Sequence, residues 1–270
     1  MLDFSGKSVL VTGGGAGIGR ACAEAFARQG ASVFIAEIDA DRCASFTAGT
    51  AINCDVTNRD DVARMAETLA AATGGRLDVL VNNVGHYLHA KPFADLTMDE
   101  VEAIIGINLT SLLSVTHAVL PLLKAAAPGS SIVNVTSIEA YRGIPTCSIY
   151  AAGKWAVRGF TKSLSLELAP LGIRVNDIAP ETTDTSQTPI DYMVPPENRA
   201  HVERWVPLGR FGHPDDCAHA ALYLASPMAS WVTGTEINID GGSLAAAGWI
   251  RDVRGVWTNM PIVTGNGMNL

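Results

Sequence analysis

The chain has 270 residues, of which 48% are hydrophobic and 17% are charged, a composition typical of a globular protein with a sizeable core. Its formal net charge of −8 argues against nucleic acids and anionic membrane surfaces as partners. The five cysteines show no Cys-x-x-Cys spacing, which favours reduced thiols in a cytoplasmic protein and gives no indication of a metal site.

Short apolar runs alternate with amphipathic stretches along most of the chain. We expect no signal peptide, because residues 1–4 lead straight into the first strand, and no membrane span, because no apolar run approaches the roughly 18 residues required. Strands are predicted at residues 8–11, 32–36, 51–54, 79–81, 131–135, 174–178 and 235–239, and helices at about 20–27, 60–72, 98–124, 149–171 and 215–225. This alternation predicts one α/β domain, a Rossmann-like doubly wound parallel sheet of about seven strands with helices on both faces.

Two regions break the alternation. Residues 180–214 hold six of the thirteen prolines and no clear strand, so we expect a functional loop, such as a lid. The predicted domain spans residues 1–242. The extension at residues 243–270 carries Trp249 and Trp257, and we expect it either to dock on the site or a neighbouring subunit, or to be solvated and partly disordered.

The stretch Thr-Gly-Gly-Gly-Ala-Gly-Ile-Gly at residues 12–19 lies between the first predicted strand and the first helix. Glycines let the backbone turn tightly and approach a pyrophosphate, and the helix N-terminus offers free N–H groups and the positive end of its dipole. The spacing differs from the common Gly-x-Gly-x-x-Gly. The order of strand, turn and helix nevertheless predicts a dinucleotide site.

Glu37 ends the second predicted strand. A carboxylate at this position accepts hydrogen bonds from the adenosine ribose hydroxyls and repels a 2′-phosphate. No Lys or Arg occupies residues 14–16 or immediately follows Glu37, so we expect NAD rather than NADP. The alternative interpretation of Glu37 is a surface carboxylate beyond a strand.

Ser137, Tyr150 and Lys154 form a second candidate group. Tyr150 and Lys154 are four residues apart, so on a helix they share one face. A nearby ammonium favours the phenolate of a tyrosine, which gives a general acid/base for an alcohol or carbonyl. Ser137 follows a predicted buried strand and adds a hydroxyl at the edge where parallel sheets bind ligands.

These motifs, in this order, resemble those of the short-chain dehydrogenase/reductase family from about Phe4 to Gly242. The resemblance adds Asp55-Val56 at the adenine, Asn82-Asn83-Val84-Gly85 after the fourth strand, Asn108 in a helix, and Asp240-Gly241-Gly242 after the last strand. The cofactor-binding residues that it implies are Gly13, Gly17, Ile18, Gly19, Glu37, Asp55, Val56, Asn83, Gly85, Tyr150, Lys154, Pro180, Thr183 and Thr185.

The resemblance implies that the protein transfers a hydride between a secondary alcohol and the nicotinamide of NAD. Tyr150 would then remove the hydroxyl proton, and Ser137 would orient and polarise the substrate oxygen. Lys154 would bind the nicotinamide ribose and lower the pKa of the tyrosine, while Asn108 would hold a water on the path of the proton. A homotetramer, or a homodimer, is implied as well, with the helices from about Met98 and Ile149 packed between subunits.

Three residues depart from the family pattern. Gly153 stands where serine is usual, Glu181 replaces the glycine that follows Pro180, and Thr183 stands where an aliphatic residue is more usual. For Glu181 we favour a carboxylate that projects toward solvent over one that contacts a polar group of the substrate.

Candidate substrate-facing residues are His86, Tyr87, His89, Glu139, Tyr141, Cys147, Glu181 and Trp205. Their aromatic and apolar groups suit a ringed secondary alcohol better than a sugar phosphate, for which clustered Arg or Lys is expected. Residues 82–85 and 90–93 also resemble dehydrogenases of cyclic cis-diols, and a steroid or terpene alcohol is a comparable alternative. A catalytically silent scaffold that binds NAD is the competing class of function.

Overall fold

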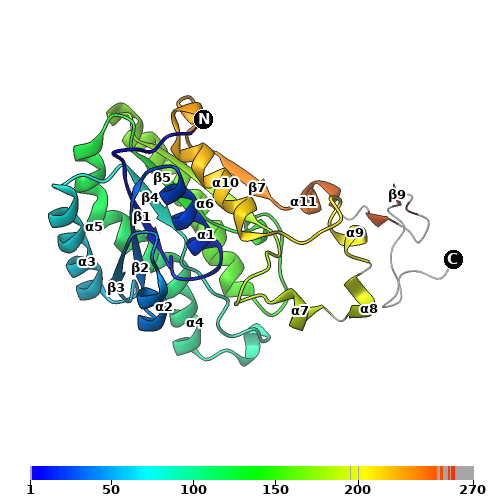
Figure 1. The fold of residues 1–270 in the computed structure, drawn as a ribbon. Coiled ribbons are helices and arrows are strands. Elements are labelled where there is room, and N and C mark those ends of the chain that lie inside the picture. Colours follow the sequence, from blue (N-terminus) through cyan, green and yellow to red (C-terminus); the bar gives the residue numbers. More distant parts are fainter. Residues whose placement is uncertain are drawn as a thin grey trace.

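A seven-stranded parallel sheet forms the centre of the molecule in the order β3-β2-β1-β4-β5-β6-β7 (Figure 1). The computed structural model describes residues 2–194, 196–199, 201–247, 250–251, 255 and 257–258. The strands are β1 (Ser8–Thr12), β2 (Ser32–Glu37), β3 (Thr50–Asn53), β4 (Val79–Asn82), β5 (Ser131–Val135), β6 (Arg174–Pro180) and β7 (Glu236–Ile239). The predicted fold class is confirmed. Strand order reverses between β1 and β4, where open parallel sheets bind ligands.

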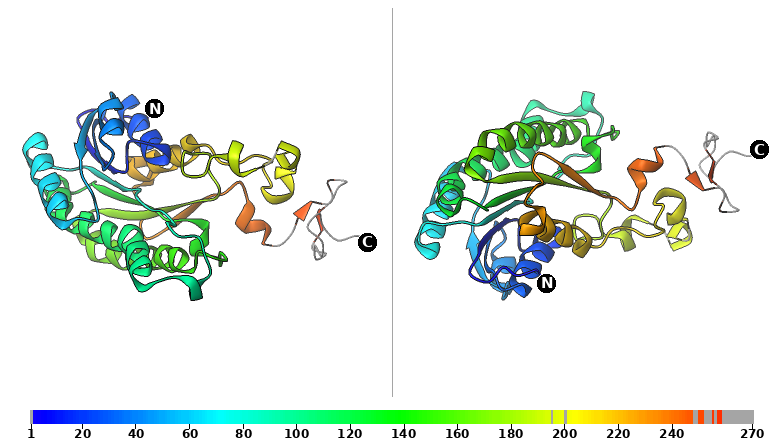
Figure 2. Two further views of the ribbon diagram at one scale, coloured as in Figure 1. Left: turned by 90° about the horizontal axis from the view of Figure 1, so that it is seen from below. Right: turned by 90° about the horizontal axis from the view of Figure 1, so that it is seen from above.

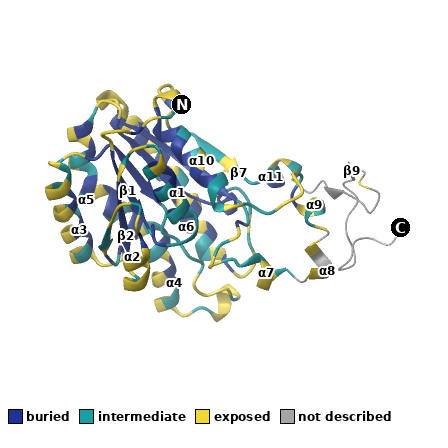
Figure 3. Ribbon diagram, viewed as in Figure 1, coloured by how far each residue is buried: buried dark blue, intermediate teal, exposed yellow. Residues whose placement is uncertain are grey.

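Helices cover both faces of the sheet, as Figure 2 shows in two views along its edge. The larger helices are α1 (Gly17–Arg28), α2 (Ala40–Ser45), α3 (Arg59–Thr73), α4 (Met98–Ile105), α5 (Ser111–Ala126), α6 (Ser148–Leu168) and α10 (Pro214–Ala225). Side chains of β1 alternate between the layers: Val9 and Val11 pack toward α1 and α10, and Leu10 packs toward α3, α5 and α6. The inner strands β1, β2, β4, β5 and β6 are therefore buried on both sides, while the edge strands β3 and β7 are partly exposed (Figure 3).

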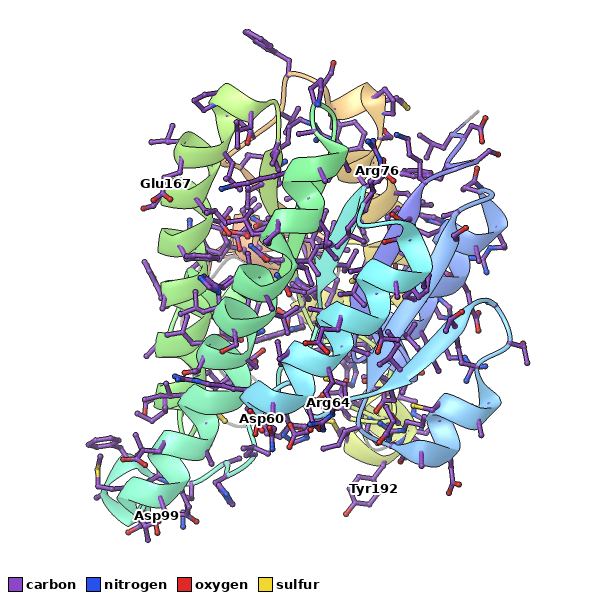
Figure 4. The ribbon with its side chains drawn as sticks, turned by 90° about the vertical axis from the view of Figure 1, so that its left-hand side faces the viewer. Asp60, Arg64, Arg76, Asp99, Glu167 and Tyr192 are labelled. Atoms are coloured by element: carbon purple, nitrogen blue, oxygen red, sulfur yellow. The ribbon has the colours of Figure 1, made fainter. Side chains whose placement is uncertain are left out.

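The layer formed by α3, α5 and α6 faces the viewer in Figure 4. Asp60 and Arg64 mark the start of α3 there, and Glu167 marks the end of α6. The same view shows Tyr192 pointing away from the molecule, in agreement with its exposed fraction of 89%.

The predicted helix over residues 98–124 is interrupted. A π-helical turn, Gly106–Thr110, separates α4 from α5 and contains Asn108. π-turns widen a helix by one residue, are rare, and occur frequently at functional sites. Hydrophobic periodicity alone does not detect such a turn.

The prediction that no apolar run is long enough to span a membrane needs correction. The stretch Met98–Ala126 has a window with mean hydropathy of 1.7, and it passes the test of length and composition among the described residues. Its Val115, Val119 and Leu123 are buried against the sheet. These residues belong to the core layer under α5, although only 39% of the window is buried.

The segment at residues 180–214 contains α7 (Ile190–Met193), α8 (Pro196–Arg199) and α9 (Val202–Trp205), and no strand is assigned in its described part. It extends away from the sheet beside α11 (Ser243–Ala246) (Figure 1). The described part of the extension adds an antiparallel pair, β8 (Ile250–Arg251) and β9 (Trp257–Thr258), and β8 contacts α9. Trp249 lies outside the described residues, and docking of the extension on the site or on a second subunit stays a prediction.

Candidate active site

The glycine-rich turn connects β1 to α1 and requires glycine for steric reasons. Gly13 and Gly17 have φ of +61° and +52°, in the left-handed region. A Cβ on Gly19 would lie 2.5 Å from Asn83 Nδ2 and would collide with the carbonyl of Gly13. Asn83 in turn donates from Nδ2 to the carbonyl of Thr12 at 3.0 Å, which joins the ends of β4 and β1. The turn is thus held in the conformation that a bound pyrophosphate needs.

An open cavity of about 550 Å³ lies beside this turn. Its lining comes from the turn, from α1, from the start of the 180–214 segment and from the start of α10, and comprises Gly15, Ala16, Gly17, Arg20, Ala21, Glu24, Arg28, Asp184, Thr185, Ser186, His213, Pro214 and Asp215. The first turn of α1 carries no acidic residue. The first-turn N–H groups of α1 therefore meet no carboxylate from their own turn, which favours an anionic ligand there, although Glu24, Asp184 and Asp215 also line the cavity.

Glu37 is buried, with 4% of its surface exposed, so its interpretation as a surface carboxylate is wrong. Its Oε2 accepts a hydrogen bond from the backbone N–H of Gly15 at 3.0 Å, and its Oε1 accepts one from Asp39 N–H at 3.1 Å. A Cβ on Gly15 would lie 2.6 Å from Glu37 Oε2 and 2.8 Å from Arg42 Cβ. Arg42 thus lies next to the turn because α2 folds back toward it, and the sequence analysis missed this residue because α2 was not predicted.

Tyr150 lies on α6 beside Ser137, which follows β5. The hydroxyl of Ser137 accepts a hydrogen bond from Glu139 N–H at 3.2 Å, which begins a short 3₁₀ turn. A hydrogen bond with Ser137 lowers the pKa of Tyr150, but loss of hydration is the larger effect and raises that pKa to about 12. The structure therefore brings the predicted serine and tyrosine together and favours the neutral phenol.

Lys154 is buried one helical turn beyond Tyr150, with 3% of its surface exposed. Its Nζ donates to the carbonyl of Val135 at 2.9 Å and lies 5.6 Å from the centre of the Tyr150 ring. Burial lowers the pKa of Lys154 to about 8. The expected lowering of the tyrosine pKa by this ammonium is not seen here, because desolvation of the phenol outweighs other effects and the amine is directed at a backbone carbonyl.

Asn108, in the π-turn, is hydrogen-bonded to the segment that follows β4. Its Nδ2 donates to the carbonyls of His86 at 2.6 Å and Ile104 at 2.9 Å, and its Oδ1 accepts from His86 N–H at 3.0 Å. A Cβ on Gly85 would lie 2.7 Å from Lys154 Nζ and 3.0 Å from Asn108 Oδ1. A Cβ on Gly153 would lie 3.3 Å from Asn108 Cβ, so the glycine found where serine is usual permits close approach of α6 to the π-turn. The water-holding role of Asn108 remains a prediction.

A charged cluster lies in the segment that follows Ser137. The guanidinium of Arg142 pairs with Glu139 at 3.0 Å and with Glu181 at 2.9 Å, and the ring of Trp205 lies 5.2 Å from it. Ser243 donates to the same oxygen of Glu181 at 2.9 Å. The prediction of a solvent-facing Glu181 is therefore wrong, because two partners hold its carboxylate inside. Arg142 was missed, although its spacing of three residues from Glu139 is a signal for an ion pair.

Of the other candidate substrate residues, some lie near Tyr150 or Glu139, and others contact residues outside this group. Tyr87 lies near the site, with its ring 6.4 Å from that of Tyr150 and 4.9 Å from that of His86. Burial lowers the pKa of His86 and raises that of Cys147, whose thiol is near Glu139. His89 instead lies 3.6 Å from Glu100 of α4, and the ring of Tyr141 lies 3.7 Å from the guanidinium carbon of Arg158.

The remaining predicted cofactor residues lie along the carboxyl edge of the sheet. Asp55 accepts from Thr57 Oγ1 at 2.7 Å, Val56 is buried, and Pro180 ends β6. Thr183 is buried and donates to the carbonyl of Glu181 at 2.9 Å, and Thr185 lies against Gly17. Ile18 packs against the core cluster under α1. Among the residues that the structure describes, no three His, Cys, Asp or Glu side chains are grouped to hold a metal ion.

Known proteins of one kind match this chain over most of its length. The family model described as enoyl-(acyl carrier protein) reductase matches residues 13–243. A 3-oxoacyl-[acyl-carrier-protein] reductase of Thermotoga maritima is 38% identical over 249 residues, which cover 89% of this chain and 99% of the relative. A 2,5-dichloro-2,5-cyclohexadiene-1,4-diol dehydrogenase of Sphingobium indicum is 34% identical over 258 residues, covering 91% of this chain and 100% of the relative. A solved 7α-hydroxysteroid dehydrogenase complexed with NADH and 7-oxo glycochenodeoxycholic acid has a TM-score of 0.82 at 32% identity, covering 89% of this chain and 95% of that one.

Proposed function

Because the chain belongs to the short-chain dehydrogenase/reductase family, whose members here are oxidoreductases, we propose that it interconverts a secondary alcohol and a ketone with NAD. The arrangement of Ser137, Tyr150 and Lys154 around one end of β5 carries this proposal. Two close contacts connect this group to the predicted dinucleotide site. A side chain at Gly19 would collide with Asn83, and a side chain at Gly85 would collide with Lys154.

Each of these side chains has a distinct task in the proposed reaction. The nicotinamide, when bound, supplies the position that accepts or returns the hydride. Tyr150 takes the proton of the substrate hydroxyl during oxidation and returns it during reduction. Ser137, hydrogen-bonded to that phenol, orients the substrate oxygen. Lys154 binds the ribose on the nicotinamide side through the N–H groups of its ammonium.

The preference for NAD over NADP rests on Glu37. Its buried carboxylate lies against Gly15, where the adenosine ribose is expected, and its charge repels a 2′-phosphate. Arg42 is the nearby cation, and its Nε lies 3.6 Å from Asp39, which balances its charge. Solved structures of similar fold are complexed with NADH or with NADP, so the proposed preference rests on Glu37 alone.

We place a cyclic, largely apolar alcohol in the substrate site, in line with the tyrosines at positions 87 and 150 and with the ring ketone bound by the solved hydroxysteroid dehydrogenase. A cyclic cis-dihydrodiol is the second candidate. The carboxylate of Glu139 favours it, because its Oε2 accepts one hydrogen bond, from Arg142, and can accept another from a second hydroxyl. The cyclohexadiene-diol dehydrogenase relative agrees with this candidate.

The proposal includes a cytoplasmic homotetramer, or a homodimer. Exposed apolar side chains on α4 and α6, namely Met98, Trp155 and Leu166, support a contact between copies through these helices. Catalytic silence is the competing proposal, and the grouping of Ser137, Tyr150 and Lys154 at one end of β5 argues against it.

A panel of substrates tests the proposal. NADH absorbance is followed with NAD or NADP and with cyclic monoalcohols, cyclic cis-diols and linear polyols. Turnover of cyclic alcohols with NAD supports the main proposal, and a strong preference for cis-diols selects the second candidate. Binding of NAD without turnover of any member favours the silent scaffold.

A further inference from the structure

Arg158 of α6 connects the turn after Ser137 to the edge of the sheet. Its Nη1 donates to the carbonyl of Ala140 at 2.6 Å, and its guanidinium carbon lies 3.7 Å from the centre of the Tyr141 ring. The same guanidinium forms an ion pair with Glu236 of β7, whose side chain is 6% exposed. One cation therefore contacts a carbonyl and a ring in the turn and a carboxylate on a strand far along the chain.

The position of the Ser137 hydroxyl depends on the 3₁₀ turn Ile138–Ala140 that follows it. The backbone N–H of Glu139 donates to that hydroxyl at 3.2 Å, and the N–H of Ala140 donates to the carbonyl of Ser137 at 2.9 Å. Ala140 is fully buried, so bulk water does not reach the carbonyl that Arg158 binds. The far end of the turn is thus fixed by this one side chain.

Glu236 fixes the chain on the other side of Ser137. Its Oε1 accepts a hydrogen bond from the hydroxyl of Thr136, the residue that precedes Ser137. Its Oε2 pairs with Arg158. The ion pair therefore links the residue before Ser137 to the end of the turn after it, and both sides of the serine are held by one buried group.

We propose that Arg158 is a positioning residue, which holds the hydroxyl of Ser137 in place by fixing the turn Ile138–Ala140 against β7. The inference rests on the proposed function, because Ser137 there orients the substrate oxygen. Arg158 touches neither substrate nor cofactor in this account. It acts through the backbone of the turn, and Glu236 offsets its charge.

A role of the ion pair in stability alone is the alternative. Removing one partner of a buried ion pair is costly, because the other charge is left alone, whereas removing both charges often costs little. Arg158→Met removes the donor to Ala140. Glu236→Gln removes the opposite charge and keeps an acceptor for Thr136. Stability and activity therefore separate when the two substitutions are combined.

Kinetics and thermal unfolding are measured for the wild type, Arg158→Met, Arg158→Met/Glu236→Gln and Lys162→Met. Lys162 is an exposed cation on α6, and its variant is expected to behave as wild type. We expect Arg158→Met to lose both stability and kcat. The double variant is expected to regain most of the stability, while its kcat stays reduced by about tenfold or more, with KM for the alcohol and NAD affinity near wild type. A kcat that recovers together with the stability overturns the proposal.

Amide hydrogen exchange of the full chain reports on the turn without any reaction. In the double variant the N–H groups of Glu139 and Ala140 are expected to exchange about tenfold faster or more than in the wild type, and those of β1 at an unchanged rate. Unchanged exchange at Glu139 and Ala140 overturns the proposal. Faster exchange in a chain that oxidises no alcohol supports the role of Arg158 in fixing the turn and rejects only the proposed function.

The wild type provides the test if neither Arg158 variant folds. Exchange at Glu139 and Ala140 as slow as in the buried strand β5 supports a turn fixed in this way. Exchange as fast as in exposed loops shows that the turn is not held, which overturns the proposal.

Discussion

Glu37 Oε2 lies 3.0 Å from the backbone nitrogen of Gly15, so the carboxylate at the end of β2 is fixed against the glycine turn. The proposed preference for NAD rests on this relationship, because in a dinucleotide bound at the turn the carboxylate would repel a 2′-phosphate.

Substitution Glu37→Ser removes that charge and leaves Arg42 beside the turn. We expect the ratio of kcat/KM with NADP to that with NAD to rise by about tenfold or more, because a charge-assisted contact replaces repulsion. Steady-state kinetics with both cofactors measure the ratio. Asp41→Asn removes a carboxylate from the first turn of α2 and serves as the control with an unchanged ratio. An unaltered ratio in Glu37→Ser would show that another group selects the cofactor.

Gly19→Ala is expected to destabilise the fold and weaken NAD binding together, because its Cβ meets the carbonyl of Gly13 and the side chain of Asn83. Gly159→Ala is the matched change, since a Cβ there meets nothing within 4 Å on the exposed face of α6. It is expected to stabilise the chain by about 0.5–1 kcal/mol. Thermal unfolding measures the stability of each variant, and titration with NAD measures its affinity for the cofactor. Equal behaviour of the two variants contradicts the close approach at Gly19.

Arg142→Met leaves the carboxylates of Glu139 and Glu181 without their shared cation at the entrance to the site. Repulsion between the two carboxylates shifts the segment that carries Trp205, so we expect KM for the alcohol to rise by about tenfold. NAD binding is expected to stay unchanged. Arg64→Met on α3, whose side chain is 66% exposed, controls for loss of a surface arginine. A KM equal to that of wild type would show that Arg142, Glu139 and Glu181 take no part in substrate recognition.

Burial raises the pKa of Tyr150 to about 12, which means that the neutral phenol prevails at every lower pH. In the free protein, tyrosinate absorbance from Tyr150 should therefore be absent at neutral and moderately alkaline pH. With NAD bound, the positive nicotinamide favours the phenolate, so the acid limb of the oxidation rate is expected well below about 12. Difference titration of wild type against Tyr150→Phe, with and without NAD, measures this. A Tyr150 that ionises near neutral pH in the free protein contradicts the effect of burial.

Local patterns made much of the fold and site predictable from sequence. The strand–glycine–helix order and the spacing of Tyr150 and Lys154 are set by residues close in the chain, and the structure confirms their placement. Effects that arise between distant segments were not predictable. The ion pairs of Glu181 depend on Arg142 and Ser243, which meet only in the folded chain. The same holds for the buried side chains of Asn82, Asn134 and Asp177, which lie side by side because strand register pairs them across β4, β5 and β6.

The central claim is that the phenol of Tyr150 exchanges the proton during hydride transfer. The most direct test measures NADH formation from a cyclic secondary alcohol by the wild type, by Tyr150→Phe and by Tyr192→Phe. Tyr192 lies on α7, is 89% exposed and provides the control. We predict that Tyr150→Phe loses activity by about 100-fold or more while binding NAD as wild type does, and that Tyr192→Phe is unchanged. Retention of wild-type activity by Tyr150→Phe would contradict the account.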